Sequence, residues 1–218
     1  MRGDAMKTTV LSVQMIPNAD PMLLESLKLP REMRSLGIIT TDCDDVSYAA
    51  LDEATKKANV QVAYARSMYA GAGNAGTKLA GEFIGILAGE EPAEVRSGLE
   101  AAVRYAQEDA SFYSANEDDS IVYFAHCISR TGSYLSKEAG VPEGTAMAYC
   151  IAPPGEAIVA LDAAVKAADV ELKLFYGPPT ETNFAGGLMV GDQAACLAAC
   201  QAFADAVCAV AADPIRFG

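Results

Sequence analysis

The chain repeats itself at about half of its own length. Residues 50–60 read ALDEATKKANV and residues 160–170 read ALDAAVKAADV, so seven of eleven positions are identical when position 50 is aligned with position 160. Two alanine-rich helices can resemble each other through composition alone. In both halves, however, this segment is followed by an alternating strand, a loop, an apolar strand and a second alanine-rich helix. Composition does not reproduce an order of elements, so the repeat indicates a duplicated domain.

Both halves predict the same alternation of short strands and helices. In the first half the patterns predict strands at 9–16, 35–40, 60–65 and 81–89 and helices at 44–58 and 91–109. In the second half they predict strands at 120–129, 146–152, 170–175 and 185–190 and helices at 155–168 and 192–212. We therefore expect an α/β (α+β) protein with domains at 7–109 and 117–214. Residues 1–6 match neither copy and are expected to be a disordered start.

Charge, cysteine content and apolar run length limit the possible functions. The chain has 29 acidic and 16 basic residues, a net charge of −13, which would repel a phosphate backbone and argues against nucleic-acid binding. Its six cysteines form no C-x-x-C pair, and the single histidine, His126, makes a zinc site unfavourable. The cysteines are expected to be reduced and mostly buried. No apolar run reaches about 18 residues, so we expect no membrane span.

No motif predicts catalysis or a metal site. The G-x-S-x-G, H-E-x-x-H and Walker A patterns are absent, and His126 and Cys127 are neighbours in a strand, where their side chains point to opposite faces. GAGNAG (71–76) matches the dinucleotide fingerprint, but a strand follows it instead of a helix. A dinucleotide enzyme is therefore disfavoured. The glycine-rich stretch 66–78 is instead expected to be a flexible loop or a gate.

The segment TDCDDV (41–46) places three carboxylates, Asp42, Asp44 and Asp45, between a strand and a helix. One aspartate at this position would cap the helix and complement its dipole. Three carboxylates together could also hold a small cation. At the level of sequence both explanations remain open.

Several segments resemble the bacterial microcompartment shell domain. They are the two repeated helices with the strands that follow them, SVQMIPN (12–18), HCISRTGSYLS (126–136) and DQAACLAACQAFADAV (192–207). In that family the strand similar to SVQMIPN usually comes last, whereas here it comes first. The chain therefore resembles two tandem, circularly permuted shell domains of the ethanolamine-utilisation type, over roughly residues 10–214.

The resemblance implies a structural protein and not an enzyme. Such a protein would form homotrimers (pseudo-hexamers) that tile with other shell proteins in a microcompartment shell within the cytoplasm. It would need no cofactor, although cobalamin or a nucleotide cofactor could cross its pore. The resemblance places Lys56 and Lys166 at tile edges. It makes loops 66–80 and 175–185 the gate of a central pore, with these residues: Tyr69, Gly71, Gly73, Thr180, Glu181, Thr182 and Asn183.

The same resemblance implies an ethanolamine site. The family's paired aspartates, glutamate and aromatic residue match Asp44, Asp45, Glu82 and Phe112. A primary ammonium group needs carboxylate oxygens, and an aromatic face adds about 1–2 kcal/mol where water is excluded. The alternative function is a small-molecule sensor, built from duplicated ferredoxin-like domains, that uses the same carboxylates without assembling into a shell.

Overall fold

The computed structural model describes residues 3–68, 79–178, 180–215 and 217, and the chain divides into two compact units. Unit 2 comprises residues 7–110 together with 132–135. Unit 1 comprises residues 1–6, 111–131 and 136–218. Residues 132–135 therefore belong to unit 2 although residues of unit 1 flank them in the sequence. Residues 1–6 belong to unit 1 although unit 2 begins directly after them.

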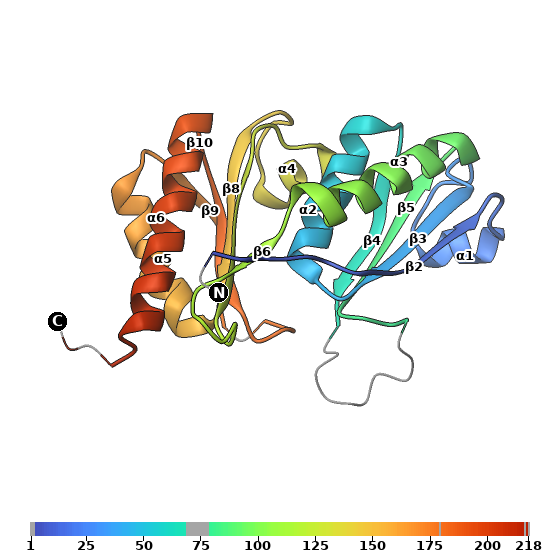
Figure 1. Cartoon of the computed structure of the whole chain (residues 1–218). Coiled ribbons are helices and arrows are strands. Elements are labelled where there is room, and N and C mark those ends of the chain that lie inside the picture. The colour runs from blue at the N-terminus through green and yellow to red at the C-terminus, as the bar shows by residue number, and fades with distance from the viewer. Residues whose placement is uncertain (1–2, 69–78, 179, 216, 218) are drawn as a thin grey trace. The chain divides into compact units, whose positions relative to one another are not determined.

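Unit 2 is a four-stranded antiparallel sheet in the order β2-β3-β5-β4, with α2 and α3 over one face (Figure 1). Glycines let the helices approach: a Cβ added at Gly85 would lie 2.7 Å from Leu51 of α2. The other face buries Leu24 of α1 against Leu36. The elements are β2 (Val10–Ile16), α1 (Pro21–Ser26), β3 (Ser35–Thr41), α2 (Asp44–Lys57), β4 (Gln61–Ser67), β5 (Phe83–Gly89), α3 (Pro92–Arg104) and a π-helical turn, η1 (Tyr105–Asp109).

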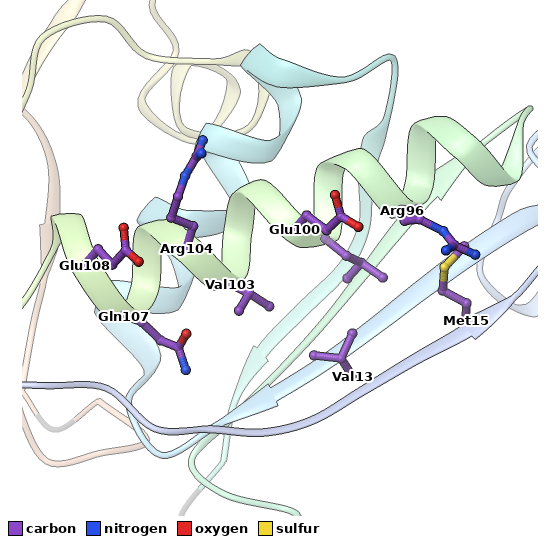
Figure 2. Close-up of a pocket in the computed structure, with 9 residues that line it drawn as sticks. Val13, Met15, Arg96, Glu100, Val103, Arg104, Gln107 and Glu108 are labelled. Carbon is purple, nitrogen blue, oxygen red and sulfur yellow. The ribbon is translucent and has the colours of Figure 1, made fainter.

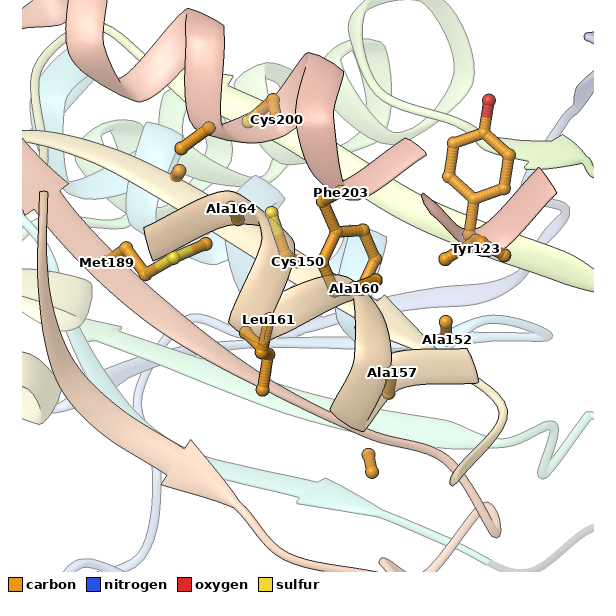
Figure 3. Packing of buried hydrophobic residues seen from close by; sticks show 14 of the residues in the cluster. Tyr123, Cys150, Ala152, Ala157, Ala160, Leu161, Ala164, Met189, Cys200 and Phe203 are labelled. Carbon is orange, nitrogen blue, oxygen red and sulfur yellow. The ribbon is translucent and has the colours of Figure 1, made fainter. Parts of the chain in front are cut away.

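Unit 1 repeats this design with a six-stranded sheet in the order β1-β6-β7-β8-β10-β9, with α5 and α6 packed on one face. Its core is built from small residues, and Figure 3 shows Phe203 beside Ala160 and Cys150 in this layer. The elements are β1 (Ala5–Met6), β6 (Phe112–Ser114), β7 (Val122–Ile128), α4 (Ser133–Ala139), β8 (Ala146–Ala152), α5 (Pro154–Ala167), β9 (Glu171–Tyr176), β10 (Ala185–Gly191) and α6 (Gln193–Ala212); residues 133–135 of α4 belong to unit 2.

Each predicted strand and helix is present in both halves, but α1, β6 and α4 were not predicted, and the start of the chain also differs. Gly3 donates its N–H to the Ser114 carbonyl at 2.8 Å, and Ala5 and Met6 pair with Tyr113 and Phe112. The expectation of a disordered start is therefore wrong for residues 3–6. These residues gain order because they complete the edge of a sheet whose other strands come from the second half of the chain.

Helix α6 is the most apolar long helix among the described residues. Within the described residues it is long and apolar enough, with a mean hydropathy of 1.8 over an 18-residue window, to cross a membrane by length and composition alone. Gln201 and Asp205 interrupt its sequence, so no uninterrupted apolar run of about 18 residues occurs in α6, as expected. Packing explains its composition, because Cys196, Phe203 and Val207 are buried in the core of unit 1.

Candidate functional site

Carboxylates gather in unit 2 where β3 ends and β5 begins. Thr41, the last residue of β3, pairs with Phe83, the first residue of β5. The start of α2 and the residue before β5 therefore lie close together. Burial raises the pKa of Glu82, and two nearby carboxylates raise it further. We call this group the acidic corner: Asp42, Asp44, Asp45 and Glu82.

The backbone of Glu82 is fixed on both sides. Its N–H donates to the Thr41 carbonyl at 2.8 Å, and its carbonyl accepts from Met68 N–H at 2.7 Å. The preceding residue, Gly81, has a φ of +64°, and an added Cβ would lie 2.0 Å from the Thr41 oxygen. Only glycine fits this position, so the turn that presents Glu82 depends on it.

The three aspartates have different local partners. Asp42 Oδ1 accepts from Thr9 N–H at 2.7 Å, and Asp44 Oδ1 accepts from Asp45 N–H at 2.9 Å. The N-cap position of α2 is occupied by Cys43, whose side chain makes no capping bond. Asp44 and Asp45 lie in the first turn, where they complement the helix dipole. Both are buried, each with 7% of its surface exposed.

The second copy of the domain lacks this group of acids. In the alignment that matches position 50 with position 160, Asp44 and Asp45 correspond to Pro154 and Gly155. In the alignment that matches β5 with β10, Glu82 corresponds to Phe184. Helix α5 nevertheless begins at Pro154, at the same point of the repeated fold. The fold therefore does not require the acidic corner, and capping alone does not account for it.

Two titratable groups that border the acidic corner, Cys43 and Tyr48, have raised pKa values. Burial raises the pKa of the Cys43 thiol, and Asp45 and Asp44 raise it further. Burial also raises the pKa of Tyr48, whose hydroxyl lies 2.9 Å from Ser67 Oγ. Both groups are thus protonated and uncharged at neutral pH. The electrostatics of the acidic corner favour a cation.

Sequence reasoning missed Thr9, Gly81 and Tyr48. Thr9 contributes only a backbone N–H, which leaves no sequence signal. A glycine directly before a buried strand was an available signal for Gly81.

The fourth residue of the predicted ethanolamine site, Phe112, belongs to unit 1. Its ring is buried there, stacked on Phe124 at a centroid distance of 5.4 Å and edge-on to Phe184 at 5.8 Å. The three acidic residues of the predicted site all belong to unit 2. The participation of Phe112 stays a prediction.

The predicted gate lies only partly within the described residues. Tyr69, Gly71 and Gly73 fall outside them. In the other loop Thr180 closes a tight turn, because its hydroxyl accepts from Phe184 N–H at 3.1 Å and its carbonyl accepts from Asn183 N–H at 3.1 Å. Asn183 has a φ of +63°, and Glu181 and Thr182 occupy the turn.

The two predicted tile-edge lysines have different partners. Lys56 pairs with Glu53 at 2.5 Å and has 24% of its side chain exposed. Lys166 pairs with Asp162 at 2.6 Å and has 72% exposed. Asp52, the counterpart of Asp162, is fully buried and accepts backbone N–H groups of residues 132 and 135, and the charge of Lys56 acts to lower the pKa of this buried carboxyl.

The cysteines of unit 1 are core residues, as predicted. Cys150 of β8 and Cys196 and Cys200 of α6 are buried free thiols, and burial raises the pKa of the half-buried Cys127 thiol to about 12. No group of three histidine, cysteine or acidic side chains among the described residues could hold a metal ion. His126 stacks on Phe124 at 5.4 Å.

A groove of about 460 Å³ lies between β2 and α3 of unit 2 (Figure 2). Val13 and Met15 of β2 form one wall, and Arg96, Glu100 and Arg104 stand along α3. The groove includes none of the predicted site residues and pairs no nucleophile with a base. It does not suggest a catalytic site.

Comparison with known proteins places these features in a family. A family model described as the BMC domain matches residues 35–117. The chain is 63% identical over 217 residues to the bacterial microcompartment shell protein EutL of Clostridium perfringens, and the match covers 100% of both chains. The crystal structure of the ethanolamine utilization protein EutL from Leptotrichia buccalis matches with a TM-score of 0.97 and 64% identity, again over 100% of both chains. A trimeric bacterial microcompartment shell protein, PduB, shares the fold with a TM-score of 0.78 and 21% identity, over 99% of this chain and 94% of that one.

Proposed function

This chain belongs to the EutL family of bacterial microcompartment shell proteins, and we propose that three copies of it form a tile in the shell of an ethanolamine-utilising microcompartment. Members of this family are structural shell proteins and not enzymes. The observation that carries the proposal is the 63% identity over the full length. Two similar units per chain support a trimer, because three chains supply six units for a ring. PduB, which shares the fold, is trimeric.

Sedimentation and electron microscopy test this assembly. The purified chain should sediment as a trimer and form extended sheets at high concentration. A small-molecule sensor built from the same two units would bind its ligand without forming sheets. A monomer that forms no sheets under any condition would contradict the shell role.

The second part of the proposal is that the acidic corner binds ethanolamine in its protonated form. Asp44, Asp45 and Glu82 supply carboxylate oxygens for charge-assisted hydrogen bonds to the ammonium group. Their absence from the second copy supports a role in binding, because the repeated fold forms without them. Phe112 is the proposed aromatic contact.

Calorimetry with Asp45→Ala tests the ethanolamine site. The heat of ethanolamine binding should disappear, while unfolding stability should fall by only about 0.3–1 kcal/mol, as expected for the loss of one negative charge from the first turn of a helix. The matched control is Asp192→Ala, because Asp192 caps α6 and accepts Ala195 N–H at 2.7 Å. This control should bind normally. Unchanged binding to the Asp45 variant would leave these aspartates with a structural role only.

The third part of the proposal is a gate on the threefold axis, formed by loops 66–80 and 175–185. The glycines of the first loop allow large backbone changes, and the Thr180 turn gives the second loop one defined arrangement. A cysteine introduced in each loop, one of them at Glu181, should cross-link across the axis. Reconstituted shells that contain the locked trimer should then exclude cofactor-sized solutes. Undiminished flux would rule out this gate.

A further inference from the structure

One face of α5 in unit 1 exposes large aliphatic side chains. Ile158 is 44% exposed, Val159 is 52% exposed and Val165 is 38% exposed. Asp162 and Lys166 lie on the same side of the helix and pair with each other. Exposed aliphatic residues grouped on a helix face are typical of a surface that another protein covers.

The duplicated helix in unit 2 shows how this face is covered. The corresponding residues of α2 are Tyr48, Ala49 and Thr55, with Asp52 in the place of Asp162. Residues 132–135 lie against this face, and Tyr134 stacks on Tyr48 at 6.2 Å.

Hydrogen bonds fix residues 132–135 to α2. Asp52 accepts N–H bonds from Gly132 at 2.7 Å and from Leu135 at 2.8 Å. Thr55 Oγ1 accepts from Ser133 N–H at 3.0 Å. In unit 2, therefore, the face that α5 leaves exposed is buried under the beginning of α4.

The repeat also identifies the counterpart of residues 132–135. Strands β2 and β7 begin at positions 10 and 122, and helices α1 and α4 begin at positions 21 and 133, so the two offsets are equal. The counterpart is therefore Asp20–Leu23, at the start of α1. In this segment Met22 is 78% exposed and Leu23 is 40% exposed. The chain thus carries a second covering segment and a second face to be covered, both exposed.

We propose that Asp20–Leu23 of one copy of this chain docks on the α5 face of the next copy, and that this contact, repeated head to tail, closes the ring of three. The inference rests on the proposed trimeric shell function and names the surfaces that meet. A heterologous contact of this kind uses two different patches, and it forms a ring when the rotation closes.

The chemistry of the two patches agrees with this pairing. Asp20 Oδ1 already accepts Met22 N–H at 2.8 Å, so α1 has its own cap and needs no carboxylate from another helix. Asp162 is correspondingly held by Lys166. The contact between copies would therefore be apolar, with Met22 and Leu23 against Ile158, Val159 and Val165. Within unit 2 the contact depends instead on the buried Asp52.

Serine substitutions test the two patches separately. Met22→Ser and Val159→Ser each remove an exposed side chain and should leave the fold of the chain intact, as circular dichroism can check. Each should raise the dissociation constant of the trimer at least about tenfold, because burial of one such side chain contributes that much or more. Leu197→Ser is the matched control: Leu197 is 53% exposed on α6 of the same unit, and its replacement should leave the trimer unchanged.

A cross-link tests the pairing directly. The double variant Met22→Cys/Val159→Cys, treated with the thiol oxidant diamide, should give covalent products of up to three chains. Each single variant, and the pair Met22→Cys/Leu197→Cys, should not. Products longer than three chains would show an open chain and overturn the closed ring.

The outcomes separate this inference from the proposed function. A wild-type chain that never forms a trimer would refute both. A wild-type trimer that is neither weakened by the serine substitutions nor cross-linked by the cysteine pair would refute only this contact.

Discussion

Replacing Asp52 by alanine should destabilise the chain strongly, although Asp52 lies in neither the proposed binding site nor the proposed gate. Its carboxylate is fully buried and accepts two backbone N–H groups, from Gly132 and Leu135. In the alanine variant both N–H groups lose their acceptor in a place that water does not reach.

The magnitude follows from these two bonds. Each buried donor left without a partner costs about 1–3 kcal/mol. Part of this cost is offset, because the variant no longer buries a carboxylate whose pKa is raised chiefly by that burial. The net loss in the free energy of unfolding should be about 2–4 kcal/mol. Asp192→Ala removes a single cap bond at an exposed helix end and should cost about 1 kcal/mol.

Urea denaturation followed by circular dichroism, at one protein concentration, compares the two variants. The midpoint of Asp52→Ala should fall about two to four times as far as that of Asp192→Ala, with similar slopes. Asp52→Asn keeps one acceptor oxygen and should lie between wild type and Asp52→Ala. If Asp52→Ala costs no more than Asp192→Ala, the two buried bonds do not hold residues 132–135 in place.

The pH dependence gives an independent reading of the same residue. Burial raises the pKa of Asp52 above its ordinary value of 3.8. A raised pKa means that the protonated carboxyl is favoured in the folded state. The stabilisation that the protonated Asp52 carboxyl gives the folded state is fully present below the ordinary pKa of 3.8. It is lost as the pH rises through the raised pKa of the folded state. The stability of wild type relative to Asp52→Asn should therefore decline as the pH rises from about 4 towards neutrality.

Three further predictions concern binding and assembly. Lys166→Glu and Lys56→Glu should leave trimers intact and block sheet formation in electron micrographs; normal sheets would show that these lysines are not at tile edges. Ethanolamine binding, measured by calorimetry, should weaken as the pH falls through the pKa of Glu82, which is raised above its ordinary value of 4.5. Glu82→Gln should remove that part of the pH dependence. Phe112→Leu should weaken ethanolamine binding about five- to thirtyfold through loss of the aromatic face. A variant that binds with the affinity of wild type would show that Phe112 does not contact the ligand.

Much of the fold could be predicted because it depends on local pattern. The repeat, the period-two strands and the helix that begins at Asp44 are all visible in residues that lie close together in the chain. The strand β1 and the first turn of α4 were not predictable in this way. Ala5 and Met6 gain their order from Phe112 and Tyr113, and Gly132 is held by Asp52, which is distant from it in sequence.

The acidic corner, too, could be predicted from the sequence only in part. The cluster of aspartates between strand and helix was visible in the sequence, and Glu82 entered only through the resemblance to a known family. Neither the pattern nor the resemblance indicated that Gly81 fixes Glu82 or that Thr9 binds Asp42. Those contacts arise from backbone groups, which every residue type carries.

The exchange of short segments between the two units has a consequence for synthesis on the ribosome. Residues 7–110 are made first, but the N–H partners of Asp52 arrive only when the chain has grown through positions 132–135. At the usual rate of synthesis this interval lasts roughly 1–5 s, during which residues 132–135 do not yet cover the Asp52 carboxylate. Residues 3–6, made earliest of all, must wait for residues 112–114 before they can pair. A chain divided near position 110 would therefore leave each piece without a short segment of its own unit, residues 132–135 for the first piece and residues 1–6 for the second.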